Sequence, residues 1–452
     1  MKKLSCQIFR SIFTSRHRCL SQYVYGPREI QKSEMLNGIQ IVAARCSGSL
    51  MTACTIMFQA GSRYETNDDL GATHFIRAMS SGSGGTSTAF AKLRLLQQQG
   101  AYLTCTSDRQ SLAFTLRCPL PLFCKLKDYL VDAAIRCPYS DWVIDDRRTL
   151  VRGDLTRMSP EQRVLDLVQN ACWAGPLGNS MFCEEGRINS MSSDTLMNFA
   201  KLHLKTIHCA VASVGIPFEE TVQLAEMIEF KVERPVSEQC HTRPCFRRGI
   251  ETYDMGPGSE TWIAAALTGC GTNNVHELFK HTIVASACGV GNMFQSQHEL
   301  DRTAQGPARE LSAGDMFAEY RAFNISYAET GIFGIVAKSR ACSASNVAYL
   351  ATDFLANVFK LNAHQIEDGK KRLQLSLALH DEDPVKASQG LALQALTCAS
   401  IDTVENSISL IDSVSNHDIA GTAATLASKS NQMAIAIVGD VNAVPTDIFY
   451  NM

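Results

Sequence analysis

Residues 70–81 read LGATHFIRAMSS, a stretch that predicts a helix with a damaged metal-binding pattern. In the zinc-binding helix written H-x-x-E-H, two imidazoles one turn apart hold the metal and the glutamate is the general base. Here His74 takes the first ligand position, whereas Arg77 takes the base position and Ala78 the second ligand position. A guanidinium keeps its proton in a protein, and a methyl group cannot coordinate a metal. The stretch therefore predicts a helix without working zinc chemistry.

Residues 60–78, AGSRYETNDDLGATHFIRA, resemble the pitrilysin or insulinase-like zinc peptidase family, in which a strand ending in A-G-S-R-x-E precedes the zinc helix. The residues that match at the family spacing are Ala60, Gly61, Ser62, Arg63, Glu65, Gly71 and His74. Arg77 and the small pair Ser80 and Ser81 are similar to one non-catalytic branch, the core subunits of mitochondrial ubiquinol–cytochrome c reductase (respiratory complex III). The resemblance implies an α+β fold of two duplicated domains, each an antiparallel sheet with helices packed against one side.

The third zinc ligand of the family is a glutamate, and its spacing from Ala78 leads to Gly153 and Asp154. Asp154 is acidic but one methylene shorter, and the register between these two positions stays open. Zinc hydrolysis needs an activated water and a base to take its proton. Because the base and one ligand are missing, we predict no metal, no catalytic residue, no cofactor and no peptidase activity.

Length and composition exclude several other classes of protein. The 452 residues predict roughly two to four domains, and a net charge of −3 argues against a nucleic-acid binder. The sequence contains no G-x-S-x-G, no G-x-x-x-x-G-K-[ST] and no C-x-x-C-H pattern. The 17 cysteines stand singly, which favours a reducing compartment over a disulfide framework. No apolar run approaches the roughly 18 residues that span a bilayer, so we expect a peripheral position on any membrane.

Residues 1–22, MKKLSCQIFRSIFTSRHRCLSQ, predict a mitochondrial presequence. The segment is rich in Arg and Ser, has no acidic residue and can place its apolar residues on one helical face, which is typical of such signals. The alternative is a basic start without a targeting role. Cleavage would fall near Arg18 to Gln22, and the sequence does not fix the bond.

The composition divides the rest of the chain into two peptidase-like domains, residues 35–230 and residues 259–452. Residues 231–258 carry Pro235, Pro244 and Pro257 with little periodicity, which predicts a linker. The second domain resembles a copy of the first: the helical segments with Ile144 and Ile366 lie 366 − 144 = 222 residues apart, and the strand ends at Gly215 and Gly439 lie 439 − 215 = 224 residues apart. Agreeing offsets of this size indicate a tandem repeat.

Local signals predict several elements of the first domain. Residues 102–106 and 111–118 are expected to form an antiparallel strand pair, and residues 86–99 a helix with Phe90 and Leu93 on its apolar face. Ser159 and Gln162 have the spacing of a capping box, with proline at the first helical position between them.

The resemblance implies a structural subunit that has no enzyme activity of its own and is needed for assembly and stability of complex III. The implied partners are the related core protein 1, cytochrome b, cytochrome c1 and the iron–sulfur protein. The implied location is the matrix side of the mitochondrial inner membrane. A presequence-like peptide, bound in the cleft but not cut, is a further candidate ligand.

The alternative is the non-catalytic α-subunit of the mitochondrial processing peptidase, which has the same fold and also lacks the zinc motif. By the resemblance, that subunit carries a long, flexible glycine-rich loop in its second domain, which handles presequences. The corresponding segment here, residues 288–292, contains only Gly289 and Gly291. The short form favours the core subunit of complex III.

Overall fold

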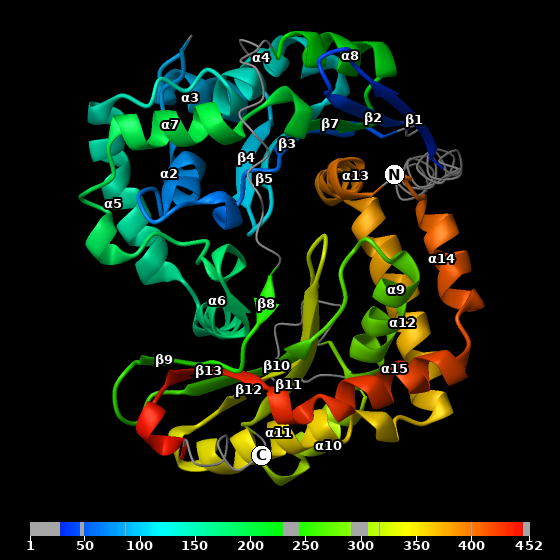
Figure 1. Ribbon diagram of the computed structural model, residues 1–452. Helices are drawn as coiled ribbons and strands as arrows, with labels where there is room; N and C mark the ends of the chain where they lie inside the picture. The colour runs from blue at the N-terminus through cyan, green and yellow to red at the C-terminus, as the bar shows by residue number, and fades with distance from the viewer. Residues whose placement is uncertain are drawn as a thin grey trace, which may run out of the picture.

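The computed structural model describes residues 28–45, 49–85, 87–228, 244–290, 306–315, 317–398 and 400–445. Two sheets, each with its own helices, face one another across the middle of the molecule (Figure 1). This mixed architecture confirms the predicted α+β fold of two sheet-and-helix units. The presequence predicted at residues 1–22 lies outside the described residues. Among the described residues, no helix is long and apolar enough to cross a membrane.

The first half is built on a six-stranded sheet of order β1-β2-β7-β3-β5-β4. Its strands are β1 (Glu29–Glu34), β2 (Gln40–Arg45), β3 (Met51–Phe58), β4 (Tyr102–Ser107), β5 (Leu112–Pro119) and β7 (Cys209–Val214). Its helices are α2 (Ala72–Met79), α3 (Ala89–Gln98), α4 (Phe123–Ala134), α5 (Asp141–Arg157), α6 (Pro160–Cys172), α7 (Ser193–His203) and α8 (Phe218–Glu226). The predicted pair of β4 and β5 is antiparallel and in register from Tyr102 opposite Arg117.

The second half is built on a five-stranded sheet of order β11-β12-β10-β13-β9. Its strands are β9 (Ile250–Asp254), β10 (Thr261–Thr268), β11 (Glu319–Ser326), β12 (Gly331–Ser339) and β13 (Ala434–Gly439). Its helices are α9 (Val275–Cys288), α10 (Pro307–Leu311), α11 (Ala344–Ala356), α12 (Ala363–Glu382), α13 (Pro384–Thr397), α14 (Val404–Ser413) and α15 (Asn416–Ser428). The short strands β6 (Trp173–Ala174) and β8 (Cys245–Phe246) pair with each other.

The two sheets repeat one topology. The central strand, β3 or β10, has an antiparallel neighbour on each side, and an outer strand adds in parallel beyond one of them. Each sheet is antiparallel, as expected, apart from one parallel pair, β2 with β7 in the first sheet and β9 with β13 in the second. The shared order supports the duplication that we infer from the sequence.

The stretch expected to be a linker contains part of the second sheet. Residues 229–243 lie outside the described residues, but Ile250–Asp254 forms the edge strand β9 beside β13. The strand is short and exposed along most of its length, so it lacks the apolar alternation that marks a strand in a sequence. The second sheet thus begins before residue 259.

Each half lends one helix to the sheet of the other half (Figure 1). Helix α6 places Val164, Val168 and Ala171 against the β10 and β13 side chains of the second sheet. Helix α13, which begins 384 − 160 = 224 residues later, covers Val42, Met57 and Val214 of the first sheet. Helices thus cover both faces of each sheet, not one face as expected. This exchange also explains why β3 and β10 read as continuous apolar runs, since both of their faces are buried.

Because of this exchange, residues 28–228 expressed alone are expected to be aggregation-prone. Without α13, the sheet face that carries Val42, Met57 and Val214 would be left in water. Co-expression with residues 244–445 should restore a soluble complex of the two fragments, measured by size-exclusion chromatography and binding of a hydrophobic dye. A monodisperse, folded first half that binds no dye would show that its sheet does not need α13 to cover it.

Helix α3 differs from its expected packing. Phe90 is 74% exposed and Leu93 is 56% exposed, whereas only Lys92 and Leu96 of this helix are buried. The Lys92 ammonium donates to the carbonyl of Ser80 at 3.2 Å, so the helix docks through a polar residue and one leucine. The periodic apolar face is therefore split between the core and the surface.

Candidate functional site at helix α2

Helix α2 begins at a buried carboxylate. Glu65 accepts hydrogen bonds from the backbone N–H groups of Gly71 (2.9 Å) and Thr73 (2.8 Å), and from the Thr73 hydroxyl (2.6 Å). These donors belong to the first turn of the helix, whose N–H groups have no partner within the helix. Gly71 has φ = 93°, a left-handed conformation that glycine adopts without strain. The A-G-S-R-x-E stretch thus fixes where α2 starts.

His74 is fully buried and is held through both ring nitrogens. Its Nδ1 accepts the backbone N–H of Cys183 at 3.1 Å, which places the ring proton on Nε2. That proton points at Asp154 Oδ2, 3.4 Å from Nε2. Burial first, and then the Arg77 charge, lower the pKa of His74 to about 4, although Asp154 opposes the shift. The imidazole is therefore neutral at physiological pH.

The carboxylate of Asp154, on α5, faces His74. We infer that Asp154, and not Gly153, takes the third-ligand position of the family, whose register the sequence leaves open. Two donors on one tetrahedral zinc, each about 2.1 Å from the metal, lie about 3.4 Å apart. The separation of Nε2 and Oδ2 equals this value. Two of the three ligand positions thus retain donors at zinc-ligand spacing.

The remaining positions do not fit a metal. Ala78 is 5% exposed and presents a methyl group one turn after His74. Arg77 donates from Nη1 to the Ser107 hydroxyl at 3.0 Å, and its guanidinium lies 5.3 Å from the centre of the Phe182 ring. A cation at this place repels a metal ion. Across the described part of the chain, no group of three or more His, Cys, Asp or Glu side chains could hold a metal.

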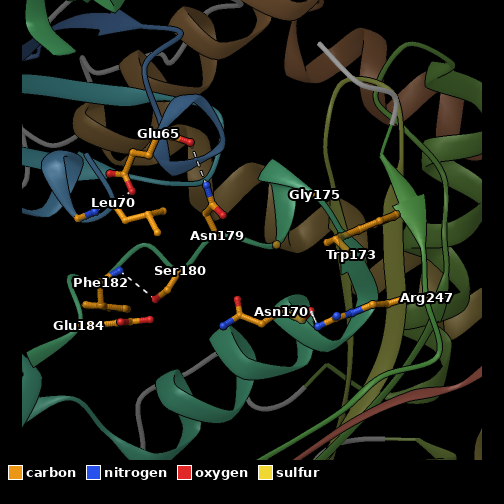
Figure 2. Close-up of a pocket in the computed structure, with 12 residues that line it drawn as sticks. Glu65, Leu70, Asn170, Trp173, Gly175, Asn179, Ser180, Phe182, Glu184 and Arg247 are labelled. Carbon is orange, nitrogen blue, oxygen red and sulfur yellow. Dashed lines mark hydrogen bonds between the residues drawn. The ribbon is translucent and has the colours of Figure 1, made fainter. Parts of the chain in front are cut away.

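A pocket of about 310 Å³ lies beside the first turn of α2 (Figure 2). Asn179 donates from Nδ2 to the backbone carbonyl of Glu65 at 3.1 Å, and Arg247 donates from Nη2 to the carbonyl of Asn170 at 2.9 Å. These polar groups of the wall are engaged with the protein itself. The pocket therefore offers no converging set of ligands for a catalytic metal.

The stability of the protein is expected to depend on pH through His74. Its pKa is about 4 in the folded protein and 6.5 ordinarily, so the unfolded chain binds more protons between these values. The contribution of His74 to the free energy of unfolding should therefore fall by at most about 3 kcal/mol as pH drops from 6.5 to 4. His74→Gln should remove this fall in urea unfolding measured across that range.

Comparing the slopes of the two proteins separates the effect of His74 on stability from the opposite effect of Glu65. Burial raises the pKa of Glu65 to about 7, so Glu65 lowers stability as pH rises between about 4.5 and 7. Both proteins keep Glu65, and the difference between them reports His74 alone. His276→Gln, at an exposed position on α9, is the matched control and should keep the slope. An equal slope in His74→Gln would contradict the assignment.

Comparisons with known proteins find a family model that matches this region of the chain. Residues 42–185 match the family model Insulinase (Peptidase family M16). The resemblance to the insulinase-like peptidases is confirmed. The matched segment contains the whole of α2 with His74, Arg77 and Ala78, and also Asp154.

Two relatives with mitochondrial names are similar over nearly the whole chain. The mitochondrial-processing peptidase subunit alpha of Solanum tuberosum is 24% identical and covers 94% of this chain and 85% of its own length. The cytochrome b-c1 complex subunit 2 of Homo sapiens is 23% identical and covers 90% and 89%. A chain of complex III2 from Candida albicans superposes with a TM-score of 0.75 and 12% identity, over 91% of this chain and 96% of that chain, which confirms the fold.

The sequence predicts the residues at the altered zinc-motif positions, but not all of the groups that hold those residues in place. His74, Arg77 and Ala78 lie on α2 as expected, and Asp154 joins them from α5. The cap by Glu65 had a signal, since this residue belongs to the family motif. No sequence signal pointed to the Cys183 N–H that fixes the His74 tautomer, because every residue except proline has a backbone N–H.

Proposed function

We propose that the chain is a structural core subunit of mitochondrial respiratory complex III, equivalent to core protein 2, and is inactive as a peptidase. The observation that carries the proposal is the intact insulinase-like fold around a broken site. Arg77 and Ala78 replace the base and a ligand. The protonated Nε2 of His74 donates to Asp154, whereas a zinc ligand would need an unprotonated nitrogen there to bind the metal. A fold kept without its chemistry supports a structural role.

The proposed partners are core protein 1, cytochrome b, cytochrome c1 and the iron–sulfur protein, on the matrix side of the inner membrane. Exposed apolar side chains support an interface. Phe90 and Leu93 on α3 are 74% and 56% exposed, and Tyr102 on the edge strand β4 is 67% exposed. Large apolar residues left in water often mark contact surfaces. The subunit's role is to support assembly and stability of the complex, and no nucleic acid takes part.

The second candidate is the α-subunit of the mitochondrial processing peptidase, favoured by the similarity to the potato subunit. A hollow of about 1030 Å³ supports binding of a basic, presequence-like peptide, because its wall carries Glu184, Glu185 and Asp254. Arg152 and Arg163 line the same hollow and oppose such a ligand. Of the glycine-poor segment at residues 288–292, the structure describes only the first three residues.

Native electrophoresis of solubilised mitochondria, followed by mass spectrometry of the band that contains this chain, tests the proposal. Co-migration with cytochrome b and cytochrome c1 in a large haem-containing assembly is the expected result. A soluble, haem-free heterodimer that cleaves presequences would establish the second candidate. Stoichiometric zinc with chelator-sensitive peptide cleavage by the isolated chain would refute both.

A further inference from the structure

A second hollow, of about 450 Å³, lies between the two halves and includes Arg77 in its wall. The first half contributes side chains from α2, α6 and the loop that carries Phe182. The second half contributes β11, the start of the β10–α9 loop and α13. Most of the wall surface is apolar, with contributions from Leu165, Ile325 and Leu393, although polar and charged residues outnumber apolar ones in the lining. This volume falls within the range of sites for small organic ligands.

Arg77 lines this cavity without a direct ion pair among the described residues, although the more distant Asp154 carboxylate acts on its charge. Its guanidinium donates to Ser107 and lies over Phe182, both of which line the same cavity, and it forms no ion pair with any described carboxylate. Burial lowers the pKa of Arg77, so the charged form is desolvated at this place. A desolvated cation with spare donors is costly unless an anion compensates it. The guanidinium could therefore bind the carboxylate of a ligand.

The acidic groups in the same wall are occupied. Asp108 accepts bonds from the N–H groups of Gln110 and Ser111 and from the Ser111 hydroxyl, all within its own turn. Asp166 pairs with the buried Arg109 at 2.7 Å and accepts the Ser180 hydroxyl at 2.6 Å. Neither carboxylate is directed at Arg77.

A donor on the far side of the cavity has no partner. The hydroxyl of Thr272, from the second half, is buried and makes no hydrogen bond in the described structure. An orphan hydroxyl is rare in a protein interior and marks a place where a ligand group could bind. The cavity thus combines a guanidinium that has no direct ion pair, a hydroxyl that has no hydrogen-bond partner, and a wall surface that is mostly apolar.

We propose that this cavity binds a free fatty acid of medium chain length, with its carboxylate on Arg77 and its alkyl chain between the two halves. The substitution that removed the catalytic base would then have reversed the preference of the cleft, from a metal cation to an organic anion. The proposal is independent of the assembly in which the chain takes part.

Isothermal titration of the purified full chain with decanoate and with decanol tests the proposal. Decanoate should bind one per chain, and decanol, which lacks the charge, about tenfold or more weakly. Arg77→Gln should weaken decanoate binding about tenfold or more and leave decanol unchanged, while Arg94→Gln, at an exposed position on α3, should change neither.

A second variant keeps the test valid if Arg77→Gln fails to fold. Ile325→Trp would fill the cavity from the second half and should abolish decanoate binding, with folding checked by circular dichroism. Equal affinity for decanoate and decanol would overturn the proposal. So would unchanged decanoate binding in folded Ile325→Trp, or binding of a peptide with a free C-terminal carboxylate in place of decanoate.

Discussion

The double substitution Arg77→Glu with Ala78→His is expected to turn this chain into a protein that binds zinc stoichiometrically. His74 Nε2 and Asp154 Oδ2 are 3.4 Å apart, the spacing of two ligands on one metal. Zinc binding moves the His74 ring proton from Nε2 to Nδ1, at the cost of the hydrogen bond that Nδ1 accepts from the Cys183 N–H. Position 78 lies four residues after His74 on α2, so an imidazole there would face the same point. Removing the guanidinium also removes the charge that repels the metal. Zinc retained after dialysis, measured by mass spectrometry, gives the result.

Two control variants isolate the effect of the restored ligand. Arg77→Glu alone removes the repelling charge but keeps the methyl group of Ala78, and Arg77→Glu with Ala78→Gln adds bulk without an imidazole. Both should bind at least about a hundredfold more weakly than the double variant, because a two-donor site holds zinc poorly. Zinc bound equally by all three variants, or by none, would show that Asp154 and His74 are not poised as ligands.

Asp166→Ala is expected to lower the free energy of unfolding by about 3–5 kcal/mol. Its partner Arg109 is fully buried and donates to the Asp166 carboxylate at 2.7 Å, to the Asp166 carbonyl at 3.0 Å and to Asn170 Oδ1 at 2.9 Å. Two further guanidinium nitrogens have no hydrogen-bond partner. Removing the carboxylate would leave a buried charge without compensation. Urea unfolding followed by fluorescence measures the loss.

An exposed ion pair on α5 gives the matched control for Asp166→Ala. Asp145, which pairs with Arg148, has a side chain that is 62% exposed. Asp145→Ala should change the free energy of unfolding by less than about 1 kcal/mol, because water screens exposed pairs. Similar losses in the two variants would mean that burial of Arg109 does not set the cost. Adding Arg109→Met to Asp166→Ala should recover part of the loss, since no charge then remains buried.

Local sequence signals predicted the structure correctly where the deciding contacts lie within a few residues of one another. The capping box of Ser159 and Gln162 forms as predicted, because both hydrogen bonds close within four residues. The β4 and β5 pair also forms as predicted, since a short turn joins the two strands directly. The prediction for the α3 face was wrong at Phe90 and Leu93, because none of the described elements packs over that side of the helix.

The sequence by itself determined which chemistry position 77 and position 78 can support, since side-chain type alone says that a guanidinium is no base and a methyl group no ligand. It also predicted the repeat, which the shared strand order supports, and the start of α2 to within two residues. Only the tertiary structure decided that Asp154 meets His74, that Cys183 fixes the imidazole tautomer, and that α6 and α13 change halves. The physical reason is distance along the chain. These contacts join residues 80 to more than 300 positions apart, and such pairings depend on how whole sheets pack, which no local pattern encodes.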